Sequence, residues 1–211
     1  MTNQPRPRIG VLGLQGDVAE HVRMLEQVGA EPVVVKRPAD LDAVDGIIIP
    51  GGESTTIGKL AEMYGLFEPL RKRIAEGLPA FGTCAGAILL SSETLFDDGR
   101  TAEQPLLGGM DTVTRRNAFG RQVASFEADI EVAGIAGEPV HAVFIRAPWF
   151  ERVGPDATVL AEVDTEQGRK AVVVRQGALL ASAFHPELTG DGRLHALFVE
   201  VVRATLGHTG P

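Results

Sequence analysis

The chain has 211 residues, of which 44% are hydrophobic and 23% charged, an ordinary composition for a soluble globular protein with one full core. Its formal net charge of -8 argues against an electrostatic nucleic-acid binder, and no apolar run approaches the roughly 18 residues that a membrane helix needs. A single cysteine, Cys84, rules out an internal disulfide and is typical of a protein from a reducing cytoplasm.

Hydrophobic periodicity in the first half of the chain predicts strands that alternate with helices. In chain order we expect a strand at 9–14, a helix at 18–28, strands at 32–35 and 46–49, helices at 55–64 and 67–76, a strand at 78–82, and a helix from residue 85. Ser54 is the expected N-cap of the helix at 55–64. Such alternation predicts a parallel sheet with helices on both faces.

The second half changes to closely spaced strands, which predict antiparallel additions to the sheet. We expect these strands at 112–115, 129–132, 140–145, 159–163, 171–174 and 179–184, and a closing amphipathic helix at 194–206. The predicted fold is therefore a single α/β domain at 8–206, a three-layer sandwich around a mostly parallel mixed sheet. Residues 1–7 and 207–211 are expected to be flexible ends.

Cys84 lies in Phe-Gly-Thr-Cys-Ala-Gly-Ala, where a short strand is expected to turn sharply into a helix. Gly82 and Gly86 flank it at two residues on either side, which leaves room for the close backbone approach that a nucleophile turn requires. The start of the following helix favours a thiolate. A buried structural thiol is the alternative, but this position favours a nucleophile.

A base and a carboxylate follow about a hundred residues later, in Phe-His-Pro-Glu. We expect Pro186 to keep His185 extended, so that His185 and Glu187 point to the same side and form a hydrogen bond. His185 would deprotonate Cys84 and later protonate the leaving amine. A metal site made of Cys84, His185 and Glu187 is a weaker alternative, and we expect no metal and no cofactor.

The Gly51-Gly52-Glu53-Ser54 turn follows a buried strand and opens a helix. Glycine permits a backbone conformation that aims an N–H at a substrate. We therefore expect the N–H groups of Gly52 and Ala85 to form an oxyanion hole.

Taken together, the Gly-Gly turn, the Gly-x-Cys-x-Gly elbow and His-Pro-Glu resemble the class I (triad) glutamine amidotransferases. The resemblance is most specific to the glutaminase subunits of pyridoxal 5'-phosphate synthase and runs from about residue 8 to 203. The stretches that carry it are 10–16, 50–56, 81–86, 116–122, 125–127, 144–148 and 184–189.

The resemblance implies the fold of that class and the hydrolysis of L-glutamine to L-glutamate and ammonia. Cys84 would form a glutamyl thioester, His185 would act as general base and acid, and Glu187 would orient His185. The same resemblance implies a glutamine pocket lined by Gly52, Glu53, Ser54, Arg116, Ile145 and Arg146.

It further implies a separate synthase subunit that receives the ammonia in a hetero-oligomeric complex, with Gln15 near the interface. Three alternatives stay open: a different ammonia acceptor, a regulatory partner without catalytic activity, and a cysteine hydrolase or redox sensor with a similar elbow. The presence of Cys84, His185 and Glu187 argues against the regulatory protein, and the sequence at 116–121 favours pyridoxal synthesis.

Overall fold

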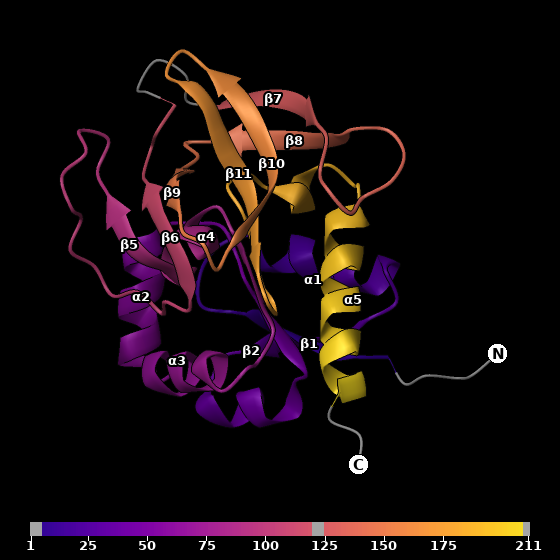
Figure 1. The fold of residues 1–211 in the computed structure, drawn as a ribbon. Helices are drawn as coiled ribbons and strands as arrows, with labels where there is room; N and C mark the ends of the chain where they lie inside the picture. The colour runs from indigo at the N-terminus through magenta and orange to yellow at the C-terminus, as the bar shows by residue number, and fades with distance from the viewer. Residues whose placement is uncertain (1–5, 120–124, 209–211) are drawn as a thin grey trace.

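The computed structural model describes residues 6–119 and 125–208, in which a mixed β-sheet is covered by helices on both faces (Figure 1). The expected flexible ends at 1–7 and 207–211 lie mostly outside these residues, as do residues 120–122 of the motif at 116–122.

Over residues 6–119 and 125–208 the main sheet has ten strands, in the order β2-β1-β3-β4-β12-β11-β9-β6-β5, with β10 paired to β11. Its strands are β1 (Arg8–Leu12), β2 (Glu31–Val35), β3 (Gly46–Ile49), β4 (Ala80–Thr83), β5 (Ser91–Leu95), β6 (Met110–Arg115), β9 (Trp149–Val153), β10 (Thr158–Thr165), β11 (Gly168–Gln176) and β12 (Leu179–Ser182). The first five strands in this order are parallel, and β11, β9 and β10 add antiparallel pairings. The predicted mostly parallel mixed sheet is confirmed.

Seven helical segments of the described residues connect and cover these strands. They are α1 (Val18–Gln27), η1 (Pro38–Ala43), α2 (Ser54–Met63), α3 (Phe67–Ala75), α4 (Ala85–Leu90), η2 (Pro186–Leu188) and α5 (Arg193–His208). The closing helix α5 thus extends two residues beyond its predicted end. None of the helices in the described ranges is long and apolar enough to cross a membrane.

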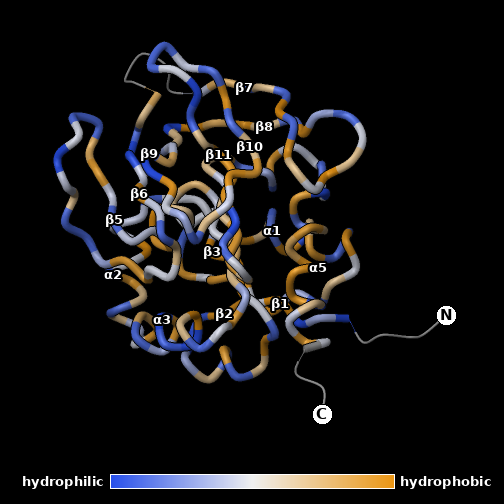
Figure 2. The backbone as a smooth tube through the Cα atoms, in the orientation of Figure 1, coloured by the Kyte–Doolittle hydropathy of each residue, from blue (hydrophilic) through white to orange (hydrophobic). Residues whose placement is uncertain are grey.

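Alternate residues of the central strands face two separate hydrophobic clusters. Ile47 and Ile49 of β3 pack with α2, α3 and α4, whereas Ile48 packs with α1 and α5. This division makes the three layers, because each central strand is buried on both faces. Figure 2 shows the hydrophobic strands in the interior and hydrophilic segments at the surface.

Two expectations for the second half were wrong. The strand expected at 129–132 is β7 (Ser125–Ile130), whose polar residues alternate with Phe126, Ala128 and Ile130. It pairs with β8 (Val140–Ile145), in a separate two-stranded sheet and not in the main one. Two strands, β5 and β9, were missed, and β5 follows α4 with no intervening turn residue to signal the change.

The expected cap of α2 was also wrong, because Ser54 is already the first residue of the helix. The Glu53 carboxylate caps it instead, accepting hydrogen bonds from the Thr56 backbone N–H at 2.9 Å and from the Thr55 hydroxyl. A carboxylate at this position also complements the positive end of the helix dipole.

Four neighbouring strands, β1, β3, β4 and β12, end on the same edge of the sheet. The chain that leaves them carries Gln15 to Asp17, Gly51 and Gly52, Cys84, and His185. Ligands of open α/β sheets bind beyond the carboxyl ends of such strands. This edge is therefore where the residues expected to be functional meet.

Candidate active site

Cys84 occupies a strained turn between β4 and α4. Its φ of 48° and ψ of -102° are rare for a residue with a side chain, and it precedes the first helical residue, Ala85. A Cβ on Gly82 would lie 2.8 Å from the Ala87 nitrogen, and one on Gly86 would lie 2.9 Å from the Ile49 carbonyl carbon. The turn can form only because these two neighbours are glycines, as the sequence predicted.

His185 and Glu187 are joined by a hydrogen bond of 2.7 Å between Nδ1 and Oε1, and both residues are 5% exposed. The backbone conformation that brings these two side chains together differs from the expected extended segment. Strand β12 ends at Ser182, and Pro186 begins the short 3-10 segment η2, not an extended segment. The tight turn brings the carboxylate back to the imidazole.

Gly51 lies between the imidazole and the thiol-bearing carbon. A Cβ placed on it would be 2.9 Å from His185 Nδ1, closer still to His185 Cε1, and 3.4 Å from Cys84 Cβ. The Gly51 N–H donates to Thr83 Oγ1 at 3.0 Å, which fixes this backbone against the elbow. Cys84 and His185 therefore both lie next to Gly51, just after the end of β3.

A second carboxylate, that of Asp17, lies 3.3 Å from the same His185 Nδ1. The hydrogen bond to His185 holds the pKa of Asp17 below its usual value. Burial lowers the pKa of His185, but hydrogen bonds with Asp17, Cys84 and Glu187 outweigh this and raise it to about 12. Burial raises the pKa of Glu187, against the opposing effect of His185. These contacts thus favour the protonated form of the imidazole.

Ligand atoms of Asp17, His185 and Glu187 also lie within 4.8 Å of one another, a spacing that a metal ion accepts. Both carboxylates, however, approach the same Nδ1. A proton on that nitrogen satisfies them, so hydrogen bonding accounts for the cluster without a metal.

The two residues expected to supply the oxyanion donors line the same cavity as Cys84. Ala85 is the first residue of α4, so its N–H has no acceptor within the helix. Gly52 has a φ of 146°, and a Cβ there would lie 2.9 Å from Gln15 Cδ. The Gln15 side chain accepts from the Glu53 N–H at 2.9 Å. Gln15 is therefore packed against the Gly52–Glu53 turn, at the mouth of the site.

A cavity of about 410 Å³ opens above Cys84 and His185. All six residues of the expected glutamine pocket line it: Gly52, Glu53, Ser54, Arg116, Ile145 and Arg146. It is further lined by Gln15, Gly16, Asp17, Ala85, Ile88, Asn117, Pro148 and Leu188.

Polar side chains on one wall of this cavity are linked to one another. The Arg116 guanidinium donates to Glu53 Oε1 at 2.7 Å and to Gln104 Oε1 at 3.1 Å, and the Ser54 hydroxyl donates to the same Gln104 oxygen at 3.1 Å. Burial raises the pKa of Glu53, but hydrogen bonds from Thr55 and Thr56 and the charge of Arg116 outweigh it, so the net shift is downward. The cavity therefore presents a carboxylate and a guanidinium side by side.

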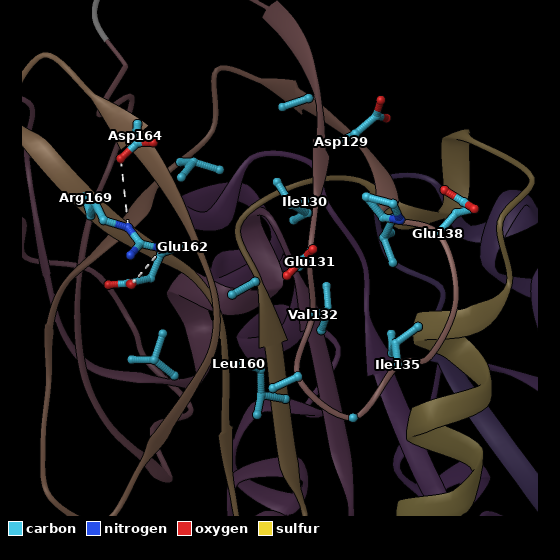
Figure 3. A pocket seen from close by; sticks show the side chains of 18 of the residues that line it. Asp129, Ile130, Glu131, Val132, Ile135, Glu138, Leu160, Glu162, Asp164 and Arg169 are labelled. Atoms are coloured by element: carbon cyan, nitrogen blue, oxygen red, sulfur yellow. Dashed lines mark ion pairs between the residues drawn. The ribbon is translucent and has the colours of Figure 1, made fainter.

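A larger cavity of about 880 Å³ lies between the loop after β7 and strand β10 (Figure 3). The Arg169 guanidinium lies 3.4 Å from Glu162 and 3.9 Å from Asp164, and the close-up shows it between these two carboxylates (Figure 3). Its lining residues contain neither cysteine nor histidine, and none of them lines the Cys84 cavity. The smaller cavity is therefore the candidate active site.

Sequence reasoning missed three residues near the site: Asp17, His21 and Gln104. Asp17 ends a Gln-Gly-Asp turn before α1, where an aspartate is usually read as a helix cap, yet its side chain makes no capping hydrogen bond. His21 carries no local signal, since its contacts come from distant segments. Gln104 lies in the connection between β5 and β6, and no motif of the sequence marks it.

Comparisons with known proteins show the family of this chain. The model of the SNO glutamine amidotransferase family matches residues 11–204. The pyridoxal 5'-phosphate synthase subunit PdxT of Frankia alni is 60% identical over 199 residues, covering 94% of this chain and 96% of that protein. The PdxT of Rhodococcus jostii is 57% identical over 201 residues, covering 94% and 98%.

A solved structure described as a glutamine amidotransferase superposes with a TM-score of 0.83 at 50% identity, covering 92% of this chain and 98% of that one. The structure of PurLQS from Thermotoga maritima, at 15% identity and a TM-score of 0.65, covers 96% of this chain and 100% of the matched one, and shares the fold. The chain belongs to the SNO glutamine amidotransferase family.

Proposed function

We propose that this chain is a glutaminase that hydrolyses L-glutamine to L-glutamate and ammonia through Cys84, His185 and Glu187. The observation that carries the proposal is Cys84 held at a strained elbow beside a buried His185–Glu187 pair, at the floor of a polar cavity. Such a constellation of nucleophile, base and orienting carboxylate defines covalent acyl transfer.

The reaction begins when His185 takes the proton of the Cys84 thiol, which leaves a thiolate beside an imidazolium. The thiolate attacks the side-chain carboxamide carbon of glutamine, and the N–H groups of Gly52 and Ala85 stabilise the resulting oxyanion. His185 gives its proton to the departing nitrogen, so ammonia leaves and a glutamyl thioester remains. His185 then takes a proton from water, which attacks the thioester, releases glutamate and restores the thiolate.

Glu53 and Arg116 are proposed to recognise the amino-acid end of glutamine. An α-ammonium suits the ionised Glu53, and an α-carboxylate suits a guanidinium such as Arg116 or Arg146. Arg146 has a φ of 43°, and strain of this kind is concentrated at sites that bind ligands. Ser54 and Ile145 complete the walls of the proposed glutamine pocket.

The ammonia is proposed to pass to a pyridoxal 5'-phosphate synthase subunit, with Gln15 near the interface. Support comes from relatives at 57% and 60% identity that are named subunits of that synthase. A nucleophilic thiol must stay reduced, so we place the reaction in the cytoplasm.

The test is release of glutamate from L-glutamine by the purified protein, with and without the synthase subunit. Cys84→Ala is the control and should lose ammonia release while retaining its fold and partner binding. His185→Asn should be severely impaired and Glu187→Gln less so, because Glu187 orients the base.

Activity that requires Cys84 and rises with the partner supports both parts of the proposal. Equal activity with and without the partner would retain the glutaminase and point to another ammonia acceptor. Binding without turnover would favour a regulatory protein, and near-normal turnover by Cys84→Ala would contradict the mechanism.

A further inference from the structure

Two histidines without a role in the proposed mechanism lie directly behind Glu187. His21 of α1 and His195 of α5 are both 0% exposed, and His21 Nδ1 lies 2.9 Å from His195 Nε2. The other nitrogen of His21, Nε2, lies 3.2 Å from Thr83 Oγ1 and 3.6 Å from Glu187 Oε2. The His21 imidazole thus lies between the Glu187 carboxylate and β4, the strand that leads to Cys84.

The second oxygen of Glu187 needs a donor. Within the described ranges, Glu187 Oε2 and His195 Nδ1 are both buried and lack a hydrogen-bond partner. A buried carboxylate oxygen left without a donor disfavours the ionised form. The 3.6 Å to His21 Nε2 is too short for an intervening water and a few tenths of an ångström longer than a hydrogen bond.

Both histidines are neutral at physiological pH. Burial, with the nearby charge of His185, lowers the pKa of His21 well below its usual value, and burial lowers the pKa of His195 to about 4. A neutral imidazole carries one N–H, so the bond between the two rings allows only two arrangements.

In the first arrangement His21 Nδ1 donates to His195 Nε2, and the proton of His195 must then sit on its Nδ1. That leaves a buried N–H without an acceptor and turns the lone pair of His21 Nε2 towards Glu187 Oε2. In the second arrangement His195 Nε2 donates to His21 Nδ1, and His21 carries its proton on Nε2. The lone pair of His195 Nδ1 then lacks a partner and the Thr83 hydroxyl oxygen accepts from His21 Nε2–H, but Glu187 Oε2 faces an N–H and not a lone pair, so the second arrangement is favoured.

We propose that His21 is a positioning residue: its Nε2–H points at Glu187 Oε2 and keeps that carboxylate ionised and oriented for His185. This inference rests on the proposed glutaminase function and extends it. Each oxygen of Glu187 then faces one imidazole, His185 on Oε1 and His21 on Oε2. Contacts of this kind lengthen in a free enzyme and shorten when charge develops during the reaction.

His21 also reaches the opposite side of the site through Thr83. The Thr83 hydroxyl lies 3.2 Å from His21 Nε2 and accepts the Gly51 N–H at 3.0 Å. The backbone that precedes Gly52 and the carboxylate that orients His185 are therefore held by one side chain. His195 affects Glu187 only indirectly, because its bond to His21 determines which nitrogen of His21 carries the proton.

The first test compares two variants of His21. Glutamine places an amide N–H where the ring carries Nε2, whereas leucine fills the space without a donor. For His21→Leu we expect kcat to fall about tenfold, the effect of leaving one buried charged acceptor without its donor, with KM changed less than twofold. His21→Gln should recover most of kcat, and alkylation of Cys84 by iodoacetamide at pH 7 should show the same order.

The second test needs no variant and therefore does not depend on their folding. Long-range proton–nitrogen NMR of the wild-type protein, labelled at histidine, reports which ring nitrogen carries the proton. We expect the Nε2–H form for both His21 and His195. The Nδ1–H form at His21 would overturn the proposal, as would equal kcat values for the leucine and glutamine variants when both are folded.

These results are separable from a failure of the proposed function. If the wild-type protein showed no Cys84-dependent turnover, the glutaminase would be refuted, whereas the NMR and alkylation readouts would still report the tautomer and its effect on the Cys84–His185 pair. If turnover were normal and His21→Leu equalled wild type, only the positioning role would be refuted.

Discussion

Substituting Gly51 by alanine should misplace the base without unfolding the protein. The added Cβ would lie 2.9 Å from His185 Nδ1, where ordinary contacts of a Cβ begin at 3.4 Å, and closer still to Cε1. The imidazole must therefore move by at least half an ångström, which disturbs its 2.7 Å bond to Glu187. Because a displacement of about 1 Å can cost about a hundredfold in rate, we expect kcat to fall by roughly that factor.

The assay is steady-state glutamate release, together with thermal unfolding of the same preparation. Gly207→Ala is the matched control, since a Cβ there meets nothing within 4 Å, and it should leave turnover unchanged. A Gly51→Ala protein with normal kcat and an unchanged melting temperature would show that His185 does not have to lie where the structure places it.

Three further predictions concern stability, binding and pH. Gly86→Ala should lower the free energy of unfolding by about 3 kcal/mol in urea titrations, despite alanine's higher helix propensity, because its Cβ would overlap the Ile49 carbonyl. Arg116→Met should raise KM for glutamine about tenfold with kcat nearly unchanged, since it removes a charge-assisted contact that acts before chemistry; an unchanged KM would exclude Arg116 from binding. The raised pKa of His185 stabilises the native state fully below about pH 6.5, and this stability declines as pH rises towards 12. This decline in stability should be absent from His185→Asn when unfolding is followed between pH 7 and 10.

The sequence predicted those parts of the fold that local patterns determine. The strand at 46–49 is a run of isoleucines closed by Pro50 and two glycines, and its predicted bounds are those of β3. Gly82 and Gly86 marked the Cys84 elbow because the crowding they relieve comes from residues near in the chain and from the adjoining strand. The assignment of the pocket residues required the family resemblance.

Other features depend on which segments pack together, and no local pattern encodes that. His21 reaches Glu187 only because α1 packs against η2, which lies more than 160 residues further along the chain. Asp17 reads as a turn residue until β12 brings His185 beside it. β5 was missed because Ser91 continues directly from a helix, and its extended conformation is imposed by pairing with β6.

The placement of the nucleophile on β4 and its base after β12 has a consequence for synthesis of the chain. A ribosome releases Cys84 about a hundred residues before His185, and β12 completes the central sheet only when it inserts between β4 and β11. During that interval Cys84 has neither His185 nor Glu187 beside it. The nascent protein therefore does not react with glutamine. Its reactivity arises in the same step in which β12 inserts between β4 and β11.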